Sequence, residues 1–160
     1  MAVLPILIWP DPRLNAVCLP VAQDVASLAT DMLDTMYAAN GRGLACPQIG
    51  VLLRMFVMDA AWKEGAFAPQ VFVNPQIIWK SDVLVNGPEG CLSLPGLTTI
   101  VARSYQLCLA WADTKARAHQ QVFDGFAAIC IQHECDHLDG ILTIDHLPAA
   151  KQAVAETAIK

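Results

Sequence analysis

Two histidines and a glutamate lie close together in the run HECDH at residues 133–137, which has the form H-E-x-x-H. An α-helix turns by about 100° per residue, so it would place His137 one turn beyond His133 and within about 40° of it. Both imidazoles could then bind one metal ion, and Glu134 would be close enough to exchange protons with a water molecule there. The run therefore predicts a metal centre with hydrolytic chemistry.

Two histidines at this spacing can also form an ordinary pair on a helix surface. Only four histidines occur in the chain, and two of them fall in this pattern with the glutamate in register. The flanking residues Ile129, Ile131 and Leu138 indicate that the helix is substantially buried. Because buried imidazoles beside a buried carboxylate need partners, which a metal ion supplies, we favour the metal site.

A third ligand must come from another part of the chain. Cys130 shares a stripe of the expected helix but lies about 10 Å of rise from His137, and Cys135 points away from both histidines. Cys91 follows the run GPEG at residues 87–90, whose glycines permit the unusual backbone that brings a thiolate and an N–H group to one point. Alone, Cys91 would be a buried structural cysteine, but beside the two histidines we favour it as the third ligand.

The run GRGLACPQ at residues 41–48 could add contacts to a substrate. Its glycines, Gly41 and Gly43, would allow a substrate backbone to approach closely, and the amide of Gln48 could donate a hydrogen bond to an oxyanion. A helix C-cap followed by a turn explains the glycines equally well. By itself this run leaves both interpretations open.

Helices and short strands must position these residues. Apolar residues recur every three or four positions from Val25 to Met36, with Asp24 placed to act as N-cap. Helices are expected over residues 24–40, 124–139 and 149–158, and strands over residues 1–10, 52–59, 71–79, 82–85, 98–101, 105–112 and 118–123. Because this order lacks strict βαβ alternation, we expect an α+β fold with mainly antiparallel sheets.

The composition fits a single globular domain over residues 1–160. Hydrophobic residues make up 55% of the chain and charged residues 16%, which provides enough apolar side chains for a buried core. The net charge of −5 argues against non-specific binding to nucleic acid, because such binding requires cations that neutralise phosphates.

The N-terminus indicates neither export nor a membrane anchor. The first ten residues lack a basic segment and contain Pro5 and Pro10, unlike a signal peptide. No apolar run reaches the roughly 20 residues that a membrane-spanning helix needs. The six cysteines are therefore expected as reduced thiols in a cytoplasmic protein rather than as a disulfide framework.

Three runs together resemble the peptide deformylase family. The family signatures G-x-G-L-A-A-x-Q, E-G-C-L-S and Q-H-E-x-D-H are similar to residues 41–48, 89–93 and 132–137, in the same order. The resemblance covers the chain from near Asp11 to about Pro148. H-E-x-x-H alone is shared by many metallopeptidases, but three ordered runs are specific.

The resemblance implies removal of the formyl group from N-formylmethionyl peptides of nascent proteins, with release of formate. It implies antiparallel sheets around the helix that carries the metal motif. Three side chains would hold the ion, those of Cys91, His133 and His137. Glu134 would be the acid/base, while the side chain of Gln48 and the backbone N–H of Leu92 would face the carbonyl oxygen.

The resemblance also implies a cofactor and a cleft. Fe(II) is the expected ion, although two imidazoles and a thiolate would also bind zinc, nickel or cobalt, and raw affinity favours zinc over iron. Gly43, Leu44 and Gly90 would line the cleft for the substrate backbone.

Arg42 departs from the family pattern, in which an aliphatic residue stands beside the substrate pocket. We expect it at the rim of the cleft for the methionine side chain, where its guanidinium either pairs with a carboxylate of the peptide or extends into water. Cys46 replaces the second alanine of the signature, and only twelve residues follow Pro148. This tail carries Lys151 and Lys160, too few cations for strong docking to ribosomal RNA.

Two other functions remain open from the sequence. A zincin-like peptidase would take its third ligand downstream of H-E-x-x-H, where His146 and Glu156 are the candidates. A metal-binding module without catalysis would need neither Glu134 nor Gln48, yet both are present.

Overall fold

The computed structural model describes residues 2–159. Met1, which begins the expected N-terminal strand, and Lys160, one of the two tail lysines, lie outside the described residues. The helices and strands follow the order α1 (Ala26–Ala38), β1 (Gly43–Ala45), β2 (Met55–Met58), β3 (Gln70–Lys80), β4 (Leu84–Gly90), β5 (Thr98–Ser104), β6 (Gln106–Ala112), β7 (Ala118–Asp124), α2 (Gly125–Leu138) and α3 (Ala149–Glu156). Short 3-10 helices are η1 (Pro12–Asn15), η2 (Cys46–Ile49), η3 (Trp62–Glu64) and η4 (Thr143–His146).

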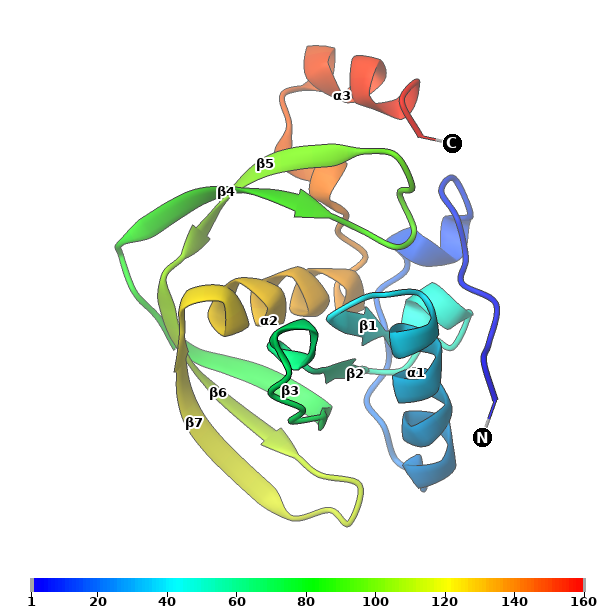
Figure 1. Cartoon of the computed structure of the whole chain (residues 1–160), viewed down its shortest axis with the longest axis vertical. Helices are drawn as coiled ribbons and strands as arrows, with labels where there is room; N and C mark the ends of the chain where they lie inside the picture. Colours follow the sequence, from blue (N-terminus) through cyan, green and yellow to red (C-terminus); the bar gives the residue numbers. More distant parts are fainter. Residues whose placement is uncertain (1, 160) are drawn as a thin grey trace.

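Two antiparallel sheets enclose α2. The larger sheet has five strands in the order β1-β2-β3-β6-β7, and the smaller sheet pairs β4 with β5. In Figure 1, α2 crosses the middle of the molecule, with β4 and β5 on one side and β3, β6 and β7 on the other. The expected α+β fold with mainly antiparallel sheets is confirmed.

Strand β2 is buried on both faces because a helix packs against each of them. Side chains alternate across a strand, so Met55 and Val57 enter the cluster with α1, while Phe56 and Met58 enter the cluster with α2. All four residues of β2 are at most 1% exposed. Burial of each such side chain contributes roughly 1.5–3 kcal/mol to the stability of the fold. This packing holds α2 against β2 and its neighbour β1.

The expected N-terminal strand is wrong. No strand forms within residues 2–10, where the backbone bonds only at single points, such as Leu7 N–H to the Gln48 carbonyl at 2.7 Å. A strand needs a continuous ladder, and Pro5 and Pro10 have no N–H to contribute.

Smaller differences concern the ends of α1 and the start of the large sheet. Helix α1 begins after Val25 as N-cap, and Asp24 instead accepts a hydrogen bond from the Ala26 N–H at 2.9 Å. Strand β1 was not expected, because a three-residue strand that begins with glycine has no recognisable pattern. The strand expected at 52–59 forms only over Met55–Met58. The six cysteines are free thiols, as predicted.

Within the described residues, no helix combines the length and the apolar character that crossing a membrane would require.

Candidate metal centre

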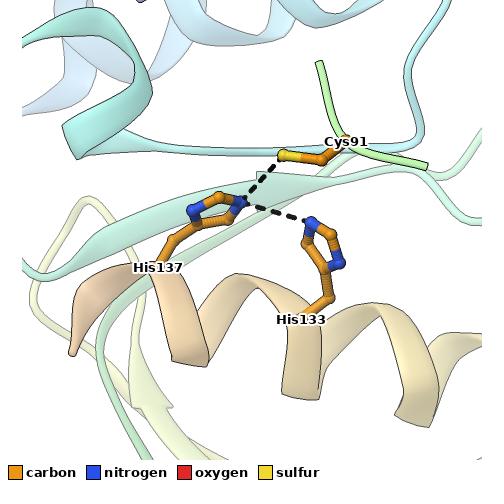
Figure 2. A group of neighbouring side chains, drawn as sticks. All are labelled: Cys91, His133 and His137. Carbon is orange, nitrogen blue, oxygen red and sulfur yellow. Dashed lines mark hydrogen bonds between the residues drawn. The ribbon is translucent and has the colours of Figure 1, made fainter. Parts of the chain in front are cut away.

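Helix α2 carries the two histidines on its inner side. His137 is 1% exposed and the side chain of His133 is 11% exposed. The helix ends before Gly140, which has a φ of 75°, a left-handed conformation that suits glycine. The spacing of one turn makes both imidazoles project toward the same side of α2, as Figure 2 shows.

Cys91 meets these imidazoles from the opposite side. It follows directly after β4, in a turn where the Leu94 N–H donates to the Cys91 carbonyl at 3.0 Å. Its Sγ lies 3.4 Å from His137 Nε2, which in turn lies 3.2 Å from His133 Nε2 (Figure 2). The three donor atoms all lie within 4.8 Å of one another and could hold one metal ion.

The spacing of these atoms fits a bound ion. Tetrahedral ligands at ordinary zinc bond lengths lie about 3.3–3.6 Å apart, close to the two distances above. Glu134 Oε1, a buried polar atom beside the site, has no hydrogen-bond partner among the described residues and could interact with a water molecule on a bound ion. The one donor group of this kind in residues 2–159 contains neither His146 nor Glu156, the ligands that a zincin-like site would need.

A chain of charged side chains supports His133 from behind. Its Nδ1 lies 2.9 Å from Glu89 Oε1, and Arg103 donates to both oxygens of Glu89 at 2.9 Å. Arg103 also donates to Asp136 at 2.6 Å, and His146 Nε2 lies 2.8 Å from the same Asp136 oxygen. Burial opposes the ionisation of Glu89, but the hydrogen bonds from His133 and Arg103 outweigh it and lower the pKa to about 2. His133 thus directs Nε2 toward Cys91 and His137.

Sequence reasoning assigned no role to this supporting chain. Glu89 and Asp136 lie inside the quoted signatures, but no local spacing predicts that they share Arg103.

Glu134 lies buried between α2 and β1. It is 4% exposed, and burial raises its pKa to about 7. A Cβ atom on Gly43 would lie 2.6 Å from Glu134 Oε2 and 3.0 Å from Cys130 Sγ. Only glycine therefore allows β1 to approach this carboxylate without displacing a neighbour.

Gln48 reaches the site from η2, which follows β1. Its Oε1 accepts from the Ala45 N–H at 3.0 Å, and its Nε2 donates to Ser93 Oγ at 3.1 Å. The same Nε2 lies 3.7 Å from Cys91 Sγ. Gln48 is 2% exposed, so its amide group is oriented and shielded from water beside the thiol.

A cleft with a volume of about 600 Å³ opens onto these groups. Most of the residues proposed from the sequence line it, namely Arg42, Gly43, Gln48, Gly90, Cys91, Leu92, His133 and Glu134. Leu44 lies beside it, with a side chain buried in the core cluster of α1. His137 is buried and does not line the cleft.

Arg42 has a partner that the sequence did not reveal. Its guanidinium forms an ion pair with Glu64 at 2.8 Å and lies 5.2 Å from the centre of the Phe126 ring. The guanidinium of Arg42 therefore does not extend freely into water, and it is already paired with a carboxylate of the protein.

Comparisons with known proteins agree with this geometry. The family model of polypeptide deformylase matches residues 3–153. A peptide deformylase of Alkalilimnicola ehrlichii is 47% identical over 95% of this chain and 86% of its own length. Among solved structures, a peptide deformylase from Legionella pneumophila is 37% identical with a TM-score of 0.92, covering 98% of this chain and 93% of that chain. One from Synechococcus elongatus, in complex with actinonin, is 33% identical with a TM-score of 0.88, covering 99% and 86%.

The α+β fold and the converging donor atoms define a metal-dependent hydrolase. The match over nearly the whole chain narrows this class, and the chain belongs to the polypeptide deformylase family. Its reaction is hydrolysis of the N-formyl group of N-formylmethionyl peptides of nascent proteins, which releases formate.

Proposed function

We propose that Cys91, His133 and His137 hold one divalent metal ion during deformylation, with Fe(II) as the physiological ion. The convergence of one sulfur and two imidazole nitrogens within 4.8 Å carries this proposal. A bound ion of this kind acts as a Lewis acid, which polarises a carbonyl group and lowers the pKa of water. Zinc, nickel and cobalt fit the same donors. The choice of iron would therefore depend on which metal is available in the cell rather than on the type of ligand.

Glu134 is the acid/base in this proposal. Its pKa of about 7 allows it to accept a proton from the attacking water and to return it to the departing amine near neutral pH. The unpartnered, buried Oε1 is available for this transfer. Atoms balance, because water supplies the hydroxyl of formic acid and the proton of the new amine.

Gln48 and Leu92 stabilise the oxyanion. The amide nitrogen of Gln48 donates one hydrogen bond to Ser93. The same nitrogen lies beside Cys91, close to the place where the formyl carbonyl of the substrate would bind. The N–H of Leu92 follows Cys91 directly. Donors that are held in place before the reaction need no rearrangement as charge develops.

The cleft binds the formylmethionyl end of the peptide. Gly43 and Gly90 line the cleft and would present their backbone to the substrate, together with the backbone of Leu44, and Arg42 forms part of the rim. Residues 1–160 act as one domain in the cytoplasm, where nascent chains are processed. Association with nucleic acid, membranes or the ribosome is not part of this proposal, since the net charge is −5.

Metal analysis of ligand variants tests the proposal. Anaerobically purified wild type should contain one equivalent of ion, and Cys91→Ala, His133→Ala and His137→Ala should each lose most of it. His146→Ala is the matched control, because among residues 2–159 the hydrogen bond of His146 goes to the outer carboxylate of Asp136 and not to the three donor atoms. Full metal content in Cys91→Ala together with loss in His146→Ala would establish the zincin-like site instead.

A further inference from the structure

The segment that follows β2, residues 59–65, holds the head of Arg42; we call this segment the strap. Arg42 Nη1 donates to the Ala60 carbonyl at 2.6 Å. Nη1 and Nη2 also donate to the two carboxylate oxygens of Glu64, at 2.9 and 2.8 Å. The planar guanidinium matches a carboxylate with two parallel bonds, so this pair has a defined geometry.

The strap also holds the backbone around Arg42. The Asp59 N–H donates to the Arg42 carbonyl at 2.9 Å, and Trp62 Nε1 donates to the Gly41 carbonyl at 2.8 Å. Arg42 is therefore fixed at both its peptide group and its head, and its side chain is only 26% exposed.

On its other side, Arg42 contacts α2. Its Cζ lies 5.2 Å from the ring centre of Phe126, within reach of a cation–π contact. Phe126 lies in the first turn of α2 and, like Arg42, lines the cleft. Arg42 thus connects the strap to α2 along one side of the cleft.

The charges of the pair are balanced. The hydrogen bonds from Arg42 lower the pKa of Glu64, so both members are ionised at neutral pH. A substrate that approaches Arg42 therefore meets a neutral pair rather than a free cation.

We propose that Arg42 is a specificity-determining wall of the cleft whose charge is withheld from the substrate by Glu64. This inference rests on the proposed function. A substrate side chain that reaches this wall would meet the aliphatic stem of Arg42 and the ring of Phe126, with no net charge. The wall does not discriminate between acidic and basic peptides.

Four proteins test this charge balance: wild type, Glu64→Gln, Arg42→Met and the double variant. The readout is the ratio of kcat/KM values for two formyl-Met peptides that differ only in carrying Glu or Lys after the methionine. Comparison between variants is required because Lys63 also lines the cleft and contributes a constant bias.

The balanced pair predicts opposite shifts. Glu64→Gln frees the cation and should raise the acidic-to-basic ratio about two- to five-fold, the range typical of partly exposed charge pairs. Arg42→Met leaves Glu64 alone and should lower the ratio by a similar factor, while the double variant should return to the wild-type value. Added salt should shrink both single-variant shifts.

A different pattern would overturn the inference. If Glu64→Gln had no effect while Arg42→Met and the double variant lowered the ratio equally, the charge of Arg42 would act on the substrate directly. An unchanged ratio in all four proteins would likewise exclude a role for the pair. Arg42→Gln replaces Arg42→Met if the latter does not fold.

Failure of the proposed metal site gives a separate result. The Cys91→Ala, His133→Ala and His137→Ala variants would then keep their metal. The ratio of kcat/KM values in the four proteins is measured independently of metal content in those variants, so the same pattern of ratios supports or overturns the role of Arg42 and Glu64.

Discussion

The imidazole of His133 and the carboxylate of Glu89 are joined by a hydrogen bond of 2.9 Å between Nδ1 and Oε1. Since Nδ1 donates to this carboxylate, Nε2 is the nitrogen that faces Cys91 and His137. Glu89 lies near the end of β4, two positions before Cys91, so one short segment provides both a thiol and the support for an imidazole.

Glu89→Gln should weaken metal binding without removing a ligand. The amide keeps the shape of the carboxylate but loses the charge that pairs with Arg103, so the orientation of His133 is held less firmly. Loss of such a supporting contact costs about 10–100-fold in metal affinity, which competition with a chromophoric chelator measures. Glu64→Gln, the same substitution outside this chain of contacts, is the control. Equal affinities in both variants would show that Glu89 does not support the site.

Gly43→Ala should displace the Glu134 carboxylate, because the new Cβ would lie 2.6 Å from Oε2. The loss in kcat should approach the about 10²–10⁴-fold that an acid/base group contributes, while bound metal is retained. Gly87→Ala is the matched control, since a Cβ there meets no atom within 4 Å. Wild-type turnover in Gly43→Ala would mean that β1 does not constrain Glu134.

Gly140→Ala should destabilise the fold at the end of α2. The residue has a φ of 75°, and an added Cβ would lie 2.5 Å from the Asn15 carbonyl oxygen. The left-handed conformation alone costs roughly 1–2 kcal/mol for a residue with a Cβ, and the clash adds to this. Gly125→Ala provides the strain without the clash, because a Cβ there meets nothing within 4 Å. The free energy of unfolding, measured with urea, should therefore be lower for Gly140→Ala than for Gly125→Ala. The reverse order would show that the contact with Asn15 does not destabilise the variant.

The iron form should lose activity in air faster than the nickel or zinc form. Oxidation of the ion opens a route to oxidised Cys91, and sulfinic or sulfonic acids are irreversible products that bind metal poorly. Activity half-lives of the three metal forms under air, with mass spectrometry of Cys91, measure this. Equal half-lives would count against both iron use and a thiolate ligand.

The local part of this site could be predicted from the sequence because helical periodicity is a local property. The spacing of His133 and His137 determines their common side of α2 whatever surrounds the helix. The antiparallel character of the sheets likewise followed from short strands without crossover helices.

Long-range contacts could not be predicted in the same way. Arg103 joins Glu89 of β4 to Asp136 of α2, and Arg42 pairs with Glu64 across 22 positions of the sequence. No sequence periodicity predicts these pairs. The turn of the strap brings Glu64 to Arg42, and the path of β5 places Arg103 between Glu89 and Asp136. The short strand β1 escaped prediction for a related reason, because only its pairing with β2 makes it a strand.

Formate release by the Glu134→Gln variant decides whether Glu134 acts as the acid/base of this site. Wild type and variant are loaded anaerobically with the same ion, their metal content is matched, and formate is measured with a formyl-Met peptide. Wild type should release one formate per free amine formed. The variant should keep its metal and fold but lose about 10²–10⁴-fold in kcat, because an amide cannot accept the proton of water. A variant that turns over within a few-fold of wild type, at equal metal content, would contradict the assignment of Glu134 and with it the mechanism proposed for this site.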